Sequence, residues 1–288
     1  MFTATKLARI ISALAFAALL SGCSAIKLGY NNIDQAAYWW LDSYIDMSDA
    51  QATRVREDLG RLHLWHRTTE LPRLAGLLQK VETLVAGEIT GPQACQVVAE
   101  VRERLEALSA QAEPAVVSTA IDLTPAQLAH MERKYRRNNA DYRKDWIDKT
   151  PAEQQDKRFK QLVERSEMIY GDLDEAQRTA LKRQIGQMTF DAGRILAERE
   201  RRQQDLLATL RKLKGQPLDQ ARNAMRGLLD RGMNPPNPAY RAWQESVIQD
   251  SCRSFAAVHA TTTAAQRETA VRRLRAYQRD LRELSAQR

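Results

Sequence analysis

The chain has little of the residues that interrupt helices and form tight turns. Its 288 residues include only 12 glycines and 9 prolines, and aromatic residues make up 6%. Sandwiches and barrels consist of short strands separated by glycine- and proline-rich turns, so this scarcity argues against them. No stretch alternates apolar and polar residues for long enough to predict a sheet. The sequence therefore points away from β-rich folds.

The motifs of common enzymes are missing as well. We find no G-x-S-x-G, no phosphate-binding glycine loop, no H-E-x-x-H and no C-x-x-C. His63 and His66 share one helical face at a spacing that either holds a metal or belongs to an ordinary packed pair, without a cysteine or third histidine nearby. We expect no catalytic residues, no metal and no cofactor. An enzyme with unrecognised site residues remains the alternative.

The excess of basic over acidic residues is also small. The chain has 44 lysines and arginines against 36 acidic residues, a formal charge of +8, and the two signs are mixed throughout. Nucleic-acid-binding proteins concentrate their basic residues on one face or stripe. We therefore expect no nucleic acid as a partner.

The N-terminus has the plan of a secretory signal peptide. Lys6 and Arg9 precede the apolar run of residues 10–20, which is too short to span a bilayer because spanning needs about 20 apolar residues. Leu20-Ser21-Gly22-Cys23 follows directly and resembles the lipobox of bacterial lipoproteins: an aliphatic residue, two small residues and the cysteine that receives lipid.

This resemblance implies a signal peptide over residues 1–22 and lipidation of Cys23, with residues 23–31 as a short tether to the folded body. The lipid makes a membrane the first expected partner, because several acyl chains anchor a protein durably. In such lipoproteins, a serine at the position of Ser24 is compatible with export to the periplasmic face of the outer membrane. The inner membrane is the less favoured location.

Residues 32–288 are predicted to form an all-α multi-helix bundle, compact or elongated. Seven sequences of the form S/T/D/N-x-x-E/Q resemble capping boxes that start helices: Asn32…Gln35, Ser48…Gln51, Thr90…Gln93, Thr124…Gln127, Thr150…Glu153, Asp174…Gln177 and Thr263…Gln266. Apolar residues between them recur every three or four positions, as Val97, Val101, Leu105 and Leu108 do. The predicted helices are 32–46, 49–69, 72–86, 92–111, 125–148, 151–170, 175–214, 217–231, 238–258 and 264–286.

Proline marks the expected interruptions. Residues 111–124 contain Pro114, which is unfavourable inside a helix, and are predicted to break the helical pattern and to subdivide the body. Residues 232–238 contain three prolines and are predicted to form an extended turn.

Aromatic residues cluster near the predicted anchor, at Tyr38, Trp39 and Trp40. Tryptophan and tyrosine are favoured at membrane interfaces, which makes the three candidates for contact with a bilayer or a partner. The alternative is that the rings pack into the bundle core, since adjacent helical positions face different directions.

The remaining cysteines form one candidate pair. Lipidation uses Cys23 and leaves Cys95 and Cys252, and disulfides persist in the oxidising periplasm. These two residues either form a disulfide or remain separate buried thiols, which pack as small apolar side chains.

Two resemblances bear on function. Residues 28–51 resemble the opening of an uncharacterised family of bacterial lipoproteins. Leu123-Thr124-Pro125-Ala126-Gln127, and less closely Leu173-Asp174-Glu175-Ala176-Gln177, resemble the LTxxQ signature of small all-helical periplasmic chaperones. Together with the predicted anchor and the missing enzyme motifs, they favour a membrane-anchored, non-enzymatic lipoprotein that binds or scaffolds other envelope proteins, with a scaffold or chaperone-like surface. The sequence does not identify those partners.

Overall fold

The computed structural model describes residues 26–287, and none of these residues lies in a strand. The all-α fold is thus confirmed for this part of the chain. Its helices are α2 (Ile33–Ile45), α3 (Asp49–Trp65), α4 (Leu71–Ala86), α5 (Gly91–Ile121), α6 (Pro125–Tyr142), α7 (Pro151–Tyr170), α8 (Glu175–Gln187), α9 (Ala192–Leu213), α10 (Leu218–Met233), α11 (Pro238–Ala260) and α12 (Ala264–Ala286). The bounds predicted for α7 and α12 agree with the structure.

Capping boxes start six of these helices, as predicted for α3, α5, α6, α7, α8 and α12. In each, the first side chain accepts a hydrogen bond from the backbone three residues on, and the Gln or Glu at that position accepts one from the capping residue's own backbone. Asn32 is the exception, because its side chain makes no cap hydrogen bond and instead donates to the carbonyl of Leu28. The prediction of a capping box at Asn32 is wrong.

Two helices contain a widened turn. A π-helical segment, η1 (His66–Glu70), joins α3 to α4 without a break, and another, η2 (Arg143–Ile147), extends α6. Pro72 explains the first, because its ring removes the N–H that an α-helix would use there, and a π turn accommodates the irregularity. Residues 49–86 therefore form one helical rod rather than the two helices that we predicted.

Helix α5 continues through Pro114 to Ile121, so the helix break predicted at residue 114 is wrong. A proline inside a helix costs about 3 kcal/mol. Beyond Pro114, Val117 and Ala120 are buried in the largest apolar cluster, and their packing offsets that cost.

The single helix predicted at 175–214 is in fact two. Met188 has an extended backbone, and Asp191 starts α9 by accepting from the N–H of Arg194. The division lets the two parts serve different cores: Leu181 packs near Val258, whereas Leu207 belongs to the largest cluster.

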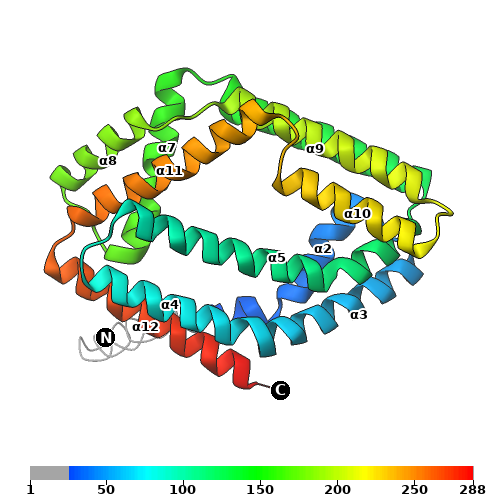
Figure 1. The fold of residues 1–288 in the computed structure, drawn as a ribbon, viewed down its shortest axis with the longest axis horizontal. Helices are drawn as coiled ribbons and strands as arrows, with labels where there is room; N and C mark the ends of the chain where they lie inside the picture. The colour runs from blue at the N-terminus through cyan, green and yellow to red at the C-terminus, as the bar shows by residue number, and fades with distance from the viewer. Residues whose placement is uncertain (1–25, 288) are drawn as a thin grey trace, which may run out of the picture.

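The helices form an elongated arrangement (Figure 1). Helices α4 and α12 lie side by side along one edge, α9 lies along the opposite edge, and α5 runs between them. One end consists of α7, α8 and the start of α12, and the other of the N-terminal end of α3 and part of α10. Four apolar clusters are distributed over this length, which favours the elongated alternative over a compact bundle.

Candidate functional site

The start of α3 is paired with the start of α6, an arrangement that we call the first junction. The Gln51 amide donates to the carbonyl of Asp122 (3.1 Å), and the Gln127 amide donates to the carbonyl of Asp46 (3.0 Å). Gln127 Nε2 also donates to Gln51 Oε1 at 2.6 Å. Each capping glutamine thus holds the turn that precedes the other helix.

The start of α8 is paired with the start of α12 in the same way, and we call this the second junction. The Gln177 amide donates to the carbonyl of Thr261 (2.9 Å), and that of Gln266 donates to the carbonyl of Asp172 (2.8 Å). Gln177 Nε2 donates to Gln266 Oε1 at 2.7 Å. In both junctions the accepting carbonyl lies two residues before the helix cap.

An apolar pocket of about 670 Å³ lies beside the first junction. Its walls come from α2, α3, α5, α6, α9 and α10. The apolar lining residues are Trp40, Leu41, Tyr44, Ile45, Met47, Val55, Leu59, Leu62, Ala112, Pro114, Ala115, Val116, Ala120, Leu123, Met131, Tyr135, Leu206, Leu210 and Met225. Burial raises the pKa of Tyr135 to about 12, so its hydroxyl remains neutral. The volume and lining suit an apolar ligand or side chains of a partner.

Polar side chains reach the pocket at few points. Asp58 and Arg61 neutralise one another in an ion pair, and the Gln203 amide exchanges two hydrogen bonds with Asn139. Arg199 also lines the pocket, with its guanidinium 5.7 Å from the ring centre of Tyr142. Gln111 and Thr119 complete the polar lining, which contains neither a nucleophile paired with a base nor a pair of facing carboxylates.

One face of α5 carries an apolar track that leads into the pocket. Val98, Val101 and Leu105 are exposed on this face, and Leu105 is 60% exposed. The same helical spacing continues through Leu108 to Ala112, Ala115 and Val116, which line the pocket. From Val98 to Val116 the track is about 27 Å long at 1.5 Å per residue. We predicted an apolar stripe over 97–108 but not its continuation past Pro114.

The three aromatic candidates separate in the structure. Tyr38 is buried beside Ala52 and Val55, with the Arg56 guanidinium 3.9 Å from its ring centre, so for this ring the structure shows the alternative of packing into the core. Trp39 and Trp40 are 62% and 61% exposed. Trp40 also lines the pocket, which places one exposed tryptophan at its rim.

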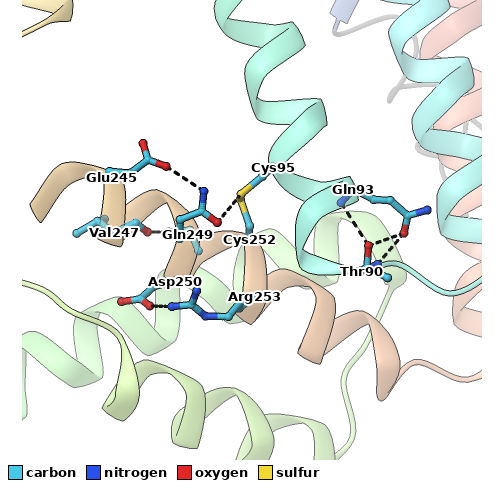
Figure 2. The surroundings of a disulfide bond; sticks show 10 residues. Thr90, Gln93, Cys95, Glu245, Val247, Gln249, Asp250, Cys252 and Arg253 are labelled. Atoms are coloured by element: carbon cyan, nitrogen blue, oxygen red, sulfur yellow. Dashed lines mark hydrogen bonds and ion pairs between the residues drawn. A yellow bond between two sulfur atoms is a disulfide. The ribbon is translucent and has the colours of Figure 1, made fainter. Parts of the chain in front are cut away.

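Cys95 and Cys252 are joined by a disulfide that connects α5 to α11, with their Cα atoms 5.4 Å apart (Figure 2). Cys252 is buried among Val85, Ala94 and Leu274. The bridge lies far along α5 from the pocket, near the start of the track.

The second junction adjoins a buried polar network. The pocket beside it, about 550 Å³, is lined mostly by polar and charged side chains, among them Thr262 and Arg267. His259 is 1% exposed; its Nδ1 lies 2.9 Å from the Tyr170 hydroxyl, and its Nε2 lies 2.8 Å from the carbonyl of Gly87. Because a carbonyl only accepts, Nε2 carries the proton and Nδ1 accepts from Tyr170. Burial lowers the pKa of His259, and the nearby Arg267 lowers it further, against the opposing effect of the Gly87 carbonyl.

His63 and His66, the candidate metal-binding pair, are not surrounded by further metal-ligating side chains in the described part of the chain. Within residues 26–287 no three His, Cys, Asp or Glu side chains are grouped to hold a metal ion. His66 Nδ1 lies 2.9 Å from the Tyr30 hydroxyl, and His63 lies 3.7 Å from Asp34. Both rings are therefore engaged in packing and hydrogen bonding around Tyr30.

The anchor prediction falls on residues 1–23, which lie outside the described part of the chain. None of the described helices is both long and apolar enough to cross a membrane.

Sequence reasoning missed the pocket, because its lining residues have the same helical spacing as ordinary core residues. The paired glutamines gave a partial signal: six of the seven predicted capping boxes have Gln at the third helical position, but the sequence does not show which of them meet. Head-to-head pairing of helix starts is a tertiary contact that helical periodicity does not encode.

A model of DUF6279, a family of unknown function, matches residues 43–232. Since the match covers more than half of the 288 residues, the chain belongs to this family. The expectation that the family is an uncharacterised one is confirmed. No curated protein and no solved structure matches the chain. The matched region contains the whole first junction but only the α8 half of the second.

Proposed function

We propose that this DUF6279 chain is a non-enzymatic lipoprotein that binds apolar segments of other cell-envelope proteins in a chaperone-like way. Lipid on Cys23 anchors it to the periplasmic face of the outer membrane. The pocket and the apolar track on α5 form the binding surface.

The observation that carries this proposal is the continuity of the track with the pocket. An extended polypeptide spans about 3.3–3.6 Å per residue, so the roughly 27 Å from Val98 to Val116 accommodates about eight residues. Burying apolar area contributes about 25 cal/mol per Å² and needs no particular sequence. A surface of this kind therefore suits clients that share apolar character rather than a motif.

The track also fits binding better than it fits a role in folding. Val98, Val101 and Leu105 are 48%, 41% and 60% exposed, so they contribute little to the apolar clusters of this chain. A row of apolar side chains kept in contact with water is a recurrent property of protein-binding surfaces.

The test is suppression of client aggregation, followed by light scattering, with the soluble fragment 24–288 and the variant Leu105→Glu. A charge in the middle of the track must be desolvated against an apolar client. We expect the concentration that gives half-protection to rise about tenfold, which corresponds to 1.4 kcal/mol. Leu218→Glu is the matched control, since Leu218 is 50% exposed and belongs to α10, not to the track on α5.

Both variants should keep the wild-type circular dichroism spectrum, because both positions are exposed. Equal protection by Leu105→Glu and Leu218→Glu contradicts the assignment of the track. No protection by the wild-type fragment at an equimolar ratio contradicts the chaperone-like function itself.

A further inference from the structure

The exposed face of residues 28–43 carries no charge. It consists of Leu28, Gly29, Asn31, Asn32, Ile33, Gln35, Ala36, Trp39, Trp40 and Ser43. Both acidic residues of α2 are turned away from it: Asp34 faces His63, and Asp42 accepts from the backbone N–H of Met47. Leu28 and Ile33 are 67% and 48% exposed, so with the two tryptophans this face presents four large apolar side chains to solvent.

Such a face is unusual in a chain with 28% charged residues. Helix α12 shows the contrast, because its exposed positions carry mostly charges, among them Glu268, Arg272, Arg275 and Arg279. A helix that faces bulk water is normally polar on its outer side. The outer side of α2 therefore faces something other than bulk water.

Cations border this uncharged face on both sides. On the α3 side, the Arg56 guanidinium lies 3.9 Å from the ring centre of Tyr38 and 5.9 Å from that of Trp39. On the α6 side, Lys134 Nζ lies 5.4 Å from the ring centre of Tyr44. Apolar and aromatic side chains flanked by cations are the pattern of helices that lie in the headgroup region of a bilayer.

We propose that the face formed by residues 28–43 lies flat on the surface of the bilayer that carries the anchor. This proposal rests on the proposed lipid at Cys23. Only two residues separate Cys23 from Ile26, where the described part of the chain begins. The start of that chain is fixed to the body, since Lys27 pairs with Asp280 at 3.3 Å and Asn31 accepts from Arg67 at 2.7 Å. The lipid therefore holds α2 close to the bilayer.

A bilayer suits this face better than a second copy of the chain or another protein. A stable protein interface engages about 20–30 residues on each side, whereas this face has ten along one helical segment. Contact with lipid needs no matching surface, and the anchor already supplies the association. The contact then orients the body, and because Trp40 also lines the pocket, it places the pocket rim next to the membrane.

The test uses the full lipidated chain, extracted from cell membranes and reconstituted with vesicles that contain brominated phosphatidylcholine. Bromine in the acyl chains quenches tryptophans that enter the bilayer. We expect quenching of the emission from Trp39 and Trp40, two of the five tryptophans. Trp39→Phe with Trp40→Phe should abolish the quenching, and Trp243→Phe should preserve it.

A second pair of variants tests the face without removing a fluorophore. Ala36→Glu puts a charge in the centre of the face and should reduce the quenching by more than half. Ala265→Glu makes the same change at an exposed alanine of α12 and should leave it unchanged. Quenching that is equal in both variants, or that persists without Trp39 and Trp40, overturns the proposal.

Vesicle flotation separates this proposal from the proposed anchor. Wild type and Ala36→Glu should both float with the vesicles, since the lipid remains. Failure of the wild type to float overturns the anchor, while quenching at saturating vesicle concentration still decides whether residues 28–43 contact lipid. If wild type floats without any quenching of Trp39 and Trp40, the face is free for a protein partner and the docking proposal is wrong.

Discussion

The two junctions have the same hydrogen bonds and different neighbours. In each, two capping glutamines pair with one another and with the turn before the opposite helix, and a buried leucine, Leu123 or Leu173, precedes one of the caps. The first junction borders an apolar pocket, whereas the second borders the buried contacts of Tyr170 with His259. Figure 1 places them at opposite ends of the molecule.

This difference shows that paired caps fix how two helix starts meet but not what fills the space beside them. That space is determined by helices arriving from elsewhere in the chain. At the second junction, His259 hydrogen-bonds both Tyr170 and the Gly87 carbonyl, so polar contacts join three segments. At the first, the side chains of α5 and α9 leave an opening.

Breaking the disulfide should cause the largest loss of stability. The bridge links the two junctions, because α5 leads towards the first junction and α11 towards the second. The bridge closes a loop with a sequence separation of 157 residues. In the chain-entropy model, Cys95→Ala with Cys252→Ala lowers the free energy of unfolding by roughly 5 kcal/mol, and measured losses are often smaller. Denaturant unfolding followed by circular dichroism measures the change.

Reductant provides the control. It should destabilise the wild type and leave the double alanine variant unchanged. Equal midpoints for the wild type with and without reductant would show that the bridge does not form in the protein.

Removing one glutamine from each junction tests whether the two are equivalent. Gln127→Ala and Gln177→Ala each delete a capping box and leave a turn carbonyl without its partner, that of Asp46 or Thr261. Unsatisfied buried groups cost about 1–3 kcal/mol, and we expect similar losses of about 2–3 kcal/mol at the two positions. Thermal and denaturant unfolding measure both.

Gln93→Ala is the matched control, since Gln93 forms a capping box with Thr90, and no hydrogen bond of its side chain to another helix is found in the described chain. Its loss should cost about 1 kcal/mol, the typical value of a helix cap. If all three variants lose the same stability, the pairing between helices contributes nothing beyond the caps.

The smallest expected effect is a pH dependence of stability that arises from His259, beside the second junction. Since burial lowers the pKa of folded His259 below its ordinary value of 6.5, the unfolded chain binds the proton more readily. The stability from neutral His259 is fully present above about pH 6.5 and is lost as pH falls towards the folded pKa, by at most about 1.4 kcal/mol per pH unit. Unfolding free energies between pH 7.5 and 5.5 should fall less steeply in His259→Gln than in wild type.

His63 and His66 also have lowered pKa values, so the difference between variant and wild type, not the wild-type slope alone, reports on His259. The variant Gln127→Ala, at the first junction, should keep the wild-type slope. An unchanged slope in His259→Gln would contradict the role of this ring.

The helices were predictable where local chemistry determines them. Six of seven capping boxes are confirmed, because a polar cap and a Gln or Glu three residues on interact within one turn. The errors occur where distant contacts decide: Val117 and Ala120 pack into a core and carry α5 past Pro114. Likewise the helix break at Met188 follows from the two cores that Leu181 and Leu207 enter.

The candidate site was less accessible to sequence analysis. The pocket is a space between six helices that no side chain fills. The spacing of apolar residues within each helix does not predict such a space. The uncharged face of residues 28–43 was visible only in part, through Trp39 and Trp40, because burial was needed to show that Asp34 and Asp42 turn inward.

The disulfide also changes what a protease can achieve. The loops that separate α5 from α6, α6 from α7, and so on to α11 all lie between Cys95 and Cys252. A single cut in any of them leaves two fragments that are still covalently joined and still share the cores. In an oxidising compartment such a cleaved molecule keeps both junctions together. A cut that would separate the fragments of a bundle without the disulfide therefore leaves this one assembled.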